Sequence, residues 1–310
     1  MSDSLTFKSP AKVNYFLRVG EKLPNGYHEI ATVMSTVDIY DRITVSFEGK
    51  GIAVESDNKE VPGGPLNTVY RAVEALLKEA KVDVGVRVNI EKTIPLESGL
   101  GGASSNAASV MLKLNEHLSL GFGKDELLAV GMKIGSDVPF FIFGSPALVT
   151  GTGENVKKIE EIPKTWMVVV KPPGSVSTKL AYKKIDLGLT FNKKSIIIPT
   201  FNGTLEGLVK GMSNDFETVV GAGPIDNGKN DGRERGVGDE GKGGEDNIYL
   251  PDVSRIKGEL EKLGSLKSML TGSGSSVFGI FEDQVVAKRA FEEIRSNQEW
   301  KVFLAQNLFY

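Results

Sequence analysis

The chain has 310 residues, of which 40% are hydrophobic and 25% charged, and its formal net charge at pH 7 is −3. This length allows one large domain or two ordinary ones with a sizeable core, and the charge leaves no basic surface of the kind that binds nucleic acid. Because cysteine is absent, disulfides, thiolate metal sites and a cysteine nucleophile are excluded.

The first half of the chain mixes strand and helix patterns. Alternating apolar residues predict strands, which span 5–19, 29–39, 42–48 and 84–91. Helical periodicity predicts helices, which span 67–78, 103–118 and 124–133. A turn is expected at residues 23–27 because proline, asparagine and glycine follow one another there.

The second half repeats this mixture after a boundary near residues 160–164. The expected strands span 166–170, 266–270, 276–281 and 300–305, and the expected helices span 177–184, 203–211, 252–263 and 284–296. Mixed elements in both halves predict an α+β protein rather than a continuous βαβ winding. We expect two domains, residues 1–162 and 163–310.

Residues 221–246 have an unusual composition. Nine of these 26 residues are glycine and eleven are charged. Such a segment cannot bury enough apolar surface to offset its ordering entropy. We interpret it as a mobile surface insertion, and a regulatory or partner-binding role stays open.

Targeting and membrane signals are missing. The first residues lack the basic and apolar blocks of a signal peptide, and no window of about eighteen apolar residues is free of charges. The expected protein is therefore cytoplasmic, with no nucleic-acid or membrane partner. Both a monomer and a homodimer agree with the sequence.

The stretch from Pro95 to Ala107 is the most informative part of the chain. Three glycines, Gly99, Gly101 and Gly102, crowd the entry to a helix. A helix start offers free N–H groups to an anion, and glycines let it approach closely. Ser104 and Ser105 could cap the helix or bind a phosphate or its metal ion. A nucleotide-phosphate site and a flexible glycine turn with a serine cap both stay open, whereas the P-loop and dinucleotide patterns do not match.

Two charged residues stand in apolar surroundings. Lys12 interrupts an apolar strand, and Asp137 lies between Ser136 and an apolar run. Lys12 is either solvated or a partner for a carboxylate or transferring phosphoryl group. Asp137 is either a helix cap or turn residue, or the group that accepts a substrate hydroxyl proton.

Histidine use narrows the chemistry. His28 and His117 are the only two histidines, which excludes a His-rich zinc site. Any general base is then predicted to be a carboxylate, and any metal a hard cation on oxygen ligands.

Two turns carry further candidate groups. Residues 25–29 place Tyr27 beside His28, which suits either recognition of a planar base or an ordinary hairpin tip. Residues 271–276, rich in glycine and serine, form either a flexible turn or a cover for the triphosphate or acceptor.

The glycine-rich stretch resembles the phosphate-binding motif of the GHMP kinase superfamily. Further similar sets extend over nearly the full length, apart from 221–246; they are residues 9–14, 25–29, 135–140, 214–217 and 271–275. The resemblance implies an α+β fold of two domains. The N-terminal domain is expected to be ribosomal-protein-S5 domain-2-like, and the C-terminal one to be the ferredoxin-like GHMP domain, with the active site between them.

Within the superfamily, these sets together are similar to the branch whose acceptor is 4-diphosphocytidyl-2-C-methyl-D-erythritol. The resemblance implies transfer of phosphate from ATP, with Mg²⁺, to the 2-hydroxyl of this small molecule. Asp137 is the implied base and Lys12 its electrostatic partner, with Ser105 as a possible metal ligand. The implied ATP-binding residues are Lys92, Pro95, Gly99, Leu100, Gly101, Gly102, Ala103, Ser104 and Ser105. The implied acceptor-binding residues are Asn14, Tyr27, His28, Thr178, Tyr182, Gly272 and Ser273.

Three departures from the pattern and two rival functions accompany this hypothesis. Glu97 and Ser98 replace small or apolar residues, and Ala103 stands where a further glycine is common.

One rival is another GHMP kinase of the homoserine or mevalonate type, which needs no base-recognition turn. The other is a non-catalytic RNA-binding module, against which the net charge of −3 argues.

Overall fold

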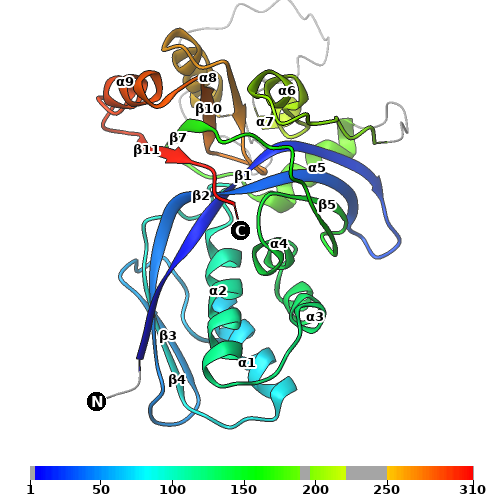
Figure 1. Ribbon diagram of the computed structural model, residues 1–310, viewed down its shortest axis with the longest axis vertical. Helices are drawn as coiled ribbons and strands as arrows, with labels where there is room; N and C mark the ends of the chain where they lie inside the picture. Colours follow the sequence, from blue (N-terminus) through cyan, green and yellow to red (C-terminus); the bar gives the residue numbers. More distant parts are fainter. Residues whose placement is uncertain (1–3, 189–195, 221–249, 310) are drawn as a thin grey trace, which may run out of the picture.

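The computed structural model describes residues 4–188, 196–220 and 250–309 and forms two sheets with helices packed on them (Figure 1). The strands are β1 (Ser4–Lys22), β2 (His28–Ser46), β3 (Ile52–Ser56), β4 (Val86–Glu91), β5 (Ala147–Gly151), β6 (Asn155–Lys158), β7 (Trp166–Lys171), β8 (Ser213–Asn214), β9 (Lys267–Leu270), β10 (Val277–Phe281) and β11 (Lys301–Gln306). The helices are η1 (Gly64–Leu66), α1 (Thr68–Ala80), α2 (Gly102–His117), α3 (Lys124–Ile134), α4 (Val138–Phe143), α5 (Thr178–Gly188), α6 (Leu205–Gly211), α7 (Glu217–Val220), α8 (Pro251–Lys262) and α9 (Gln284–Ile294).

The first sheet has seven strands, with β3-β4-β2-β1-β8 as its main path and β5 and β6 attached to β2. Helix α2 packs on it because Ala107, Val110, Met111 and Leu114 recur at helical spacing and are buried. Helix α1 buries its own apolar face in the same cluster. Because the glycine-rich stretch leads directly into α2, the packing of α2 on the sheet places this stretch in the middle of the molecule.

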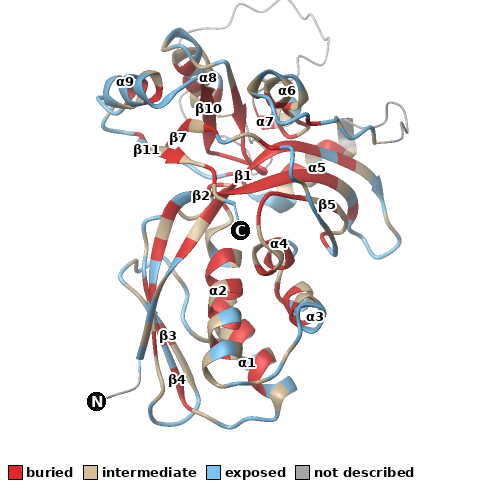
Figure 2. Ribbon diagram, viewed as in Figure 1, coloured by how far each residue is buried: buried red, intermediate tan, exposed pale blue. Residues whose placement is uncertain are grey.

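The second sheet runs β11-β7-β10-β9, and all its neighbours are antiparallel. Numbered along the chain, this is the order 4-1-3-2, which agrees with the ferredoxin-like expectation. Strand β7 alternates between two cores: Val168 and Val170 pack with α8 and α9, whereas Met167 and Val169 pack with β1. The two sheets are thus joined through β7 and β1, whose buried residues meet in the centre of Figure 2.

A second connection is made by backbone pairing. Strand β8 follows the predicted boundary by some fifty residues but pairs in parallel with β1, Phe16 opposite Ser213 and Leu17 opposite Asn214. The division at residues 162 and 163 falls between β6 of the first sheet and β7 of the second. The domain boundary itself stays a prediction, and the insertion predicted at 221–246 lies outside the described residues.

Each expected strand and helix has a counterpart, with one correction. The strands expected at 29–39 and 42–48 are the single strand β2, which continues through Asp41. The Asp41 carboxylate is fully buried and accepts the backbone N–H groups of Thr93 and Ile94, both at 2.8 Å, while pairing with the Lys92 ammonium. Because these donors compensate its charge inside the protein, Asp41 does not end the strand. The short elements β3, β5, β6, β8, α4 and α7 were not predicted.

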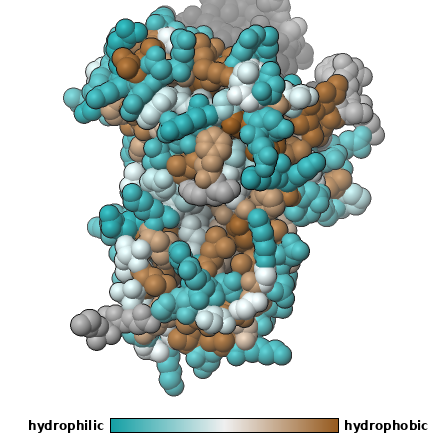
Figure 3. Space-filling model, viewed as in Figure 1, coloured by the Kyte–Doolittle hydropathy of each residue, from teal (hydrophilic) through white to brown (hydrophobic). Residues whose placement is uncertain are grey.

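The surface shows no continuous apolar band on the face drawn in Figure 3, where hydrophilic and hydrophobic residues are interspersed. Within residues 4–188, 196–220 and 250–309, no helix is long and apolar enough to cross a membrane.

We expect Asp41→Ala to lower the free energy of unfolding by about 3–5 kcal/mol, because it leaves the Lys92 ammonium and two backbone N–H groups without their acceptor. Urea unfolding followed by circular dichroism measures this change. Asp83→Ala, at an exposed position, is the matched control and should stay within about 0.5 kcal/mol. Equal effects of the two substitutions would contradict this account of Asp41.

Candidate active site

Strand β1 presents opposite chemistries on its two faces. Ala11 and Val13 pack into the apolar cluster shared with the second sheet. Lys12 and Asn14 point to the other face, as the two-residue repeat of a strand requires. Both are almost fully buried, at 3% and 2% exposure. The solvated interpretation of Lys12 is therefore wrong.

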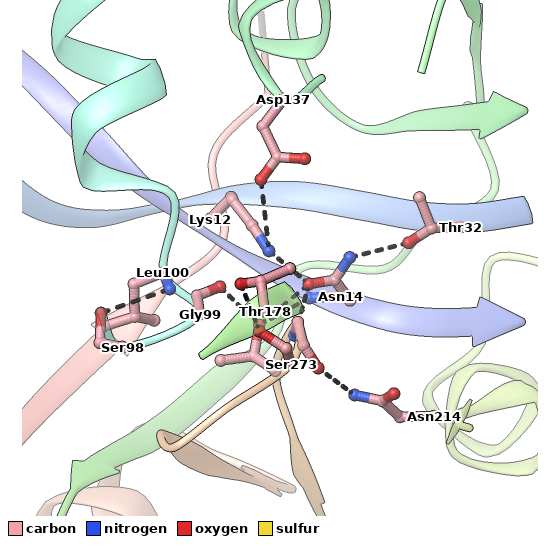
Figure 4. Close-up of polar contacts among 12 residues, drawn as sticks. Lys12, Asn14, Thr32, Ser98, Gly99, Leu100, Asp137, Thr178, Asn214 and Ser273 are labelled. Atoms are coloured by element: carbon pink, nitrogen blue, oxygen red, sulfur yellow. Dashed lines mark hydrogen bonds and ion pairs between the residues drawn. The ribbon is translucent and has the colours of Figure 1, made fainter. Parts of the chain in front are cut away.

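The Asn14 side chain ties three segments together (Figure 4). Its Oδ1 accepts the Lys12 Nζ at 2.6 Å, the Gly272 N–H at 2.8 Å and the Thr271 hydroxyl at 3.1 Å. Its Nδ2 donates to the Thr32 hydroxyl at 2.8 Å. Since Thr32 lies on β2 and Thr271 in the second half, one amide connects both sheets.

Asp137 faces Lys12 from the start of α4. It occupies the N-cap position, but its carboxylate makes no capping hydrogen bond. Instead Oδ2 lies 3.8 Å from the Lys12 Nζ (Figure 4), and the Asp137 side chain keeps 34% exposure. This geometry favours the proton-accepting interpretation of Asp137 over the capping one.

Burial controls the charge state of Lys12. Loss of water lowers the pKa of its ammonium below the ordinary 10.5, and the neighbouring Asp137 carboxylate acts in the opposite direction. The ammonium is also held by Asn14 Oδ1. A poorly hydrated cation interacts more strongly with nearby negative charge than a solvated one does.

The glycine loop (residues 95–105) lies directly beside this pair. Gly99 and Gly101 have φ of +78° and +72°, a left-handed conformation that favours glycine. A Cβ at Gly99 would lie 2.1 Å from the carbonyl oxygen of Thr271. The loop is therefore packed against the second half of the protein, and the interpretation as a flexible turn is wrong.

The predicted serine cap is also wrong. Gly101 is the N-cap of α2 and provides no side-chain cap, so Ser104 and Ser105 lie within the first turns. Ser105 is fully buried, and its hydroxyl is 2.7 Å from that of Ser9. With no side chain capping α2, its first N–H groups can serve an incoming anion.

The serine loop (residues 271–276) is buried and ordered by hydrogen bonds. Asn214 Nδ2 donates to the Gly272 carbonyl at 2.9 Å, and the Ser276 N–H donates to the Ser98 carbonyl at 3.1 Å. The hydroxyls of Ser273 and the exposed Thr178 are 3.0 Å apart. Residues 271–276 thus cover the glycine loop.

The two predicted base-recognition residues of the β1–β2 turn differ in exposure. Tyr27 is 66% exposed at the tip, whereas His28 is buried. The His28 ring stacks on Tyr182 of α5, with centroids 5.3 Å apart and planes at 18°. The interpretation of His28 as a surface histidine is therefore wrong.

Tyr182 connects this aromatic pair with Asp137. Burial, and to a smaller extent the Asp137 charge, raises the pKa of the Tyr182 phenol to about 12. Like any tyrosine hydroxyl, it is protonated at neutral pH and can donate a hydrogen bond.

A cleft of about 650 Å³ opens on the other side of the glycine loop. Its lining includes Leu66, Lys92, Glu97, Ala103, Asn106 and Lys171. The Asn106 Oδ1 is buried and has no hydrogen-bond partner among the residues that the structure describes. A buried acceptor without a partner is costly, so this atom marks a place where a polar ligand atom fits.

The structure thus gathers most predicted site residues into one region, with Lys92 and Ala103 in the adjoining cleft. Pro95 and Gly102 stay within the glycine loop, half-buried. The residues at the site that sequence reasoning did not single out are Thr32 of β2 and, in the cleft, Asn106 and Lys171. Asn106 directly follows the two serines of the motif, which is a signal that could have found it.

Comparisons with known proteins place the chain among the GHMP kinases. Residues 67–145 match the family model of the GHMP kinases N terminal domain, and residues 242–299 that of the GHMP kinases C terminal. A relative from Syntrophotalea carbinolica, named 4-diphosphocytidyl-2-C-methyl-D-erythritol kinase, is 38% identical over 97% of this chain and 98% of its own.

Two solved structures extend the comparison. One titled 4-(cytidine 5'-diphospho)-2C-methyl-D-erythritol kinase has a TM-score of 0.71 and 27% identity, covering 98% of this chain and 99% of its own. Homoserine kinase from Cytophaga hutchinsonii has a TM-score of 0.67 and 16% identity, covering 100% and 96%. The latter similarity shows a shared fold only.

We expect Gly99→Ala to impair both stability and turnover, because the added Cβ collides with the Thr271 carbonyl and forces the two loops apart. Gly121→Ala is the matched control: it has the same φ of +78° but no neighbouring atom within 4 Å. The control should cost about 1–2 kcal/mol from the left-handed conformation alone. Urea unfolding and kcat measure the two effects for both variants, and equal values for the pair would contradict the collision.

Proposed function

This chain belongs to the family of 4-diphosphocytidyl-2-C-methyl-D-erythritol kinases within the GHMP kinases, and we propose that it transfers the γ-phosphoryl group of ATP to the 2-hydroxyl of that cytidine compound. The reaction is a step of the non-mevalonate route to isoprenoid precursors. The observation that carries the proposal is the Lys12–Asp137 pair, set beside a glycine loop at the start of a helix.

In the proposed reaction, Asp137 accepts the proton of the acceptor hydroxyl. The freed oxygen forms a bond to the γ-phosphorus, and the bond from that phosphorus to the bridging oxygen breaks, which leaves ADP. Lys12 offsets negative charge on the transferring group, helped by its poor hydration. Positioning and electrostatics of this kind account for most of the catalysis in phosphoryl transfer.

The cleft beside the glycine loop suits the ATP molecule. Its volume of about 650 Å³ lies in the range of small-molecule sites. We assign the phosphates to the uncapped start of α2, with the N–H groups of Gly102, Ala103 and Ser104 as donors. The base and ribose then extend toward Lys92 and Asn106, whose unpartnered Oδ1 can accept a hydrogen bond from the nucleotide.

A magnesium ion is also part of the proposal. Among the described residues, no group of three acidic or histidine side chains could hold one. The oxygens at the site do fit an ion carried mainly by phosphates, since Mg²⁺ commonly uses one or two carboxylates besides them. Asp137 would supply that carboxylate; Ser105 fits less well because its hydroxyl is buried against Ser9. When bound, the ion would neutralise phosphate charge.

The acceptor is proposed to lie on the opposite side of Lys12. We assign its binding to Asn14, Gly272, Ser273 and Thr178, which are joined in pairs by hydrogen bonds between Asn14 and Gly272 and between Ser273 and Thr178. The aromatic residues Tyr27, His28 and Tyr182 suit the flat cytosine ring. Cytoplasmic location, a monomer or homodimer, and the absence of nucleic-acid and membrane partners stay predictions.

The proposal is tested by measuring ADP release from ATP with 4-diphosphocytidyl-2-C-methyl-D-erythritol, homoserine and mevalonate as separate acceptors. We expect turnover with the cytidine compound alone. Turnover with homoserine or mevalonate instead would support a rival GHMP activity. Salt-sensitive RNA binding without any ATP turnover would support the RNA-binding alternative.

We expect Asp137→Asn to reduce kcat by about 10²–10⁴-fold, the usual contribution of a positioned general base. The affinity for ATP measured without Mg²⁺ should change little, because Asp137 does not line the nucleotide cleft. Steady-state kinetics and calorimetric titration with ATP measure the two effects separately. A variant that keeps most of its kcat would contradict the assignment.

A further inference from the structure

Asp186 is a carboxylate of α5 that faces the β1–β2 hairpin. It lies one helical turn after Tyr182, so both side chains project from the same face of α5. Its Oδ1 is 3.0 Å from the Nε2 of His28, and its Oδ2 is 2.7 Å from the Nζ of Lys22. One acidic side chain of the second half therefore contacts two basic side chains of the first.

The imidazole of His28 is constrained on several sides. Besides the Asp186 contact at Nε2, its Nδ1 lies 3.2 Å from the carbonyl oxygen of Gly20. Its face rests on the Tyr182 ring. Both ring nitrogens thus meet oxygen atoms, and the stacking determines which plane the ring occupies. Without Asp186, the ring keeps its contacts with Gly20 and Tyr182 but loses the one at Nε2, so its orientation is less tightly defined.

Tyr182 in turn is held on its other side. The edge of its ring packs against Phe216, with centroids 5.0 Å apart and planes at 89°. His28, Tyr182 and Phe216 therefore form a continuous row of rings that runs from the hairpin to α7. In Figure 1, α5 lies beside the hairpin arms of β1 and β2, which agrees with these contacts.

We propose that Asp186 is a positioning residue of the acceptor site, which holds the His28 imidazole in the orientation that reads the acceptor's pyrimidine ring. The inference rests on the proposed function, since it concerns the same substrate. Asp186 acts through His28 and takes no part in phosphoryl transfer. We expect its effect to be confined to acceptor binding, because Asp186 does not line the cleft proposed for ATP.

A simpler role must be separated from this one. Asp186 also forms an ion pair with Lys22, so its role could be limited to holding α5 against the hairpin. Lys22 is 54% exposed, and an exposed ion pair contributes little to stability. Lys22→Met removes this ion pair and leaves the contact between Asp186 and His28 in place. It therefore serves as the matched control.

The test compares Asp186→Ala, Asp186→Asn and Lys22→Met in the full-length enzyme. We expect Asp186→Ala to raise the KM for the cytidine acceptor roughly tenfold, which corresponds to about 1.4 kcal/mol, because the imidazole loses its close contact with the carboxylate. Its kcat and its KM for ATP should stay within about twofold. Asp186→Asn keeps the size of the side chain and an oxygen that can lie beside the His28 ring, so it should recover most of the acceptor affinity. Lys22→Met should behave as wild type.

A second measurement removes the dependence on turnover. Calorimetric titration with cytidine 5′-diphosphate, a probe for the base alone, should show the same loss for Asp186→Ala. In a double-mutant cycle, His28→Ala should abolish the effect of Asp186→Ala, because the carboxylate then has no ring to hold. Thermal melting of each variant verifies that it is folded.

Several results would overturn the inference. Equal increases in both KM values, equal effects of Lys22→Met and Asp186→Ala, or additive effects with His28→Ala would each reduce Asp186 to a structural contact. The wild-type enzyme decides the proposed function independently. If wild type does not phosphorylate the cytidine compound, the proposed function fails and this inference fails with it; if it does, the variants alone decide.

Discussion

The buried side-chain amide of Asn14 is the interaction on which the rest of the site depends. Burying an amide is costly unless its donors and acceptors are used. Here Oδ1 accepts hydrogen bonds from Lys12, Thr271 and Gly272, while Nδ2 donates one to Thr32. The network is satisfied only when β1, β2 and the serine loop stand in one arrangement. A single residue thereby couples the relative position of the two sheets to the position of the Lys12 ammonium.

The chemistry of the site follows from the short distances that this network imposes between Lys12, Asp137 and the two loops. Lys12 is kept in a poorly hydrated place, where its charge acts strongly, and Asp137 faces it while retaining access to solvent. Nothing but glycine fits at residue 99, since the Thr271 carbonyl occupies the space of a side chain. The glycines therefore serve two purposes: they let the loops of the two halves interlock, and they leave the start of α2 open to phosphate.

The acceptor side is organised by helix α5. Tyr182 stacks on His28 of the hairpin, and the Asp137 charge contributes to its raised pKa, so it lies between the residues proposed for base recognition and for proton transfer. Asp186, one turn later, reaches the same hairpin. In the proposed arrangement, nucleotide and acceptor approach Lys12 from different sides, and the nucleotide cleft is lined by residues from both halves of the chain. The active site exists only where these halves meet.

The sequence by itself determined the local features: the periodicity of helices such as α2, the glycine motif, and Lys12 and Asp137 as charges in apolar surroundings. These signals depend on residues within a few positions of one another, or on motifs with a fixed spacing along the chain. Only the tertiary structure decided that β2 runs through Asp41, that Gly101 rather than a serine occupies the N-cap position of α2, and that the Ser105 hydroxyl contacts that of Ser9. It also decided that Asp186 meets His28. Each of these depends on a partner far along the chain, and such pairings are settled by packing, which local sequence patterns do not encode.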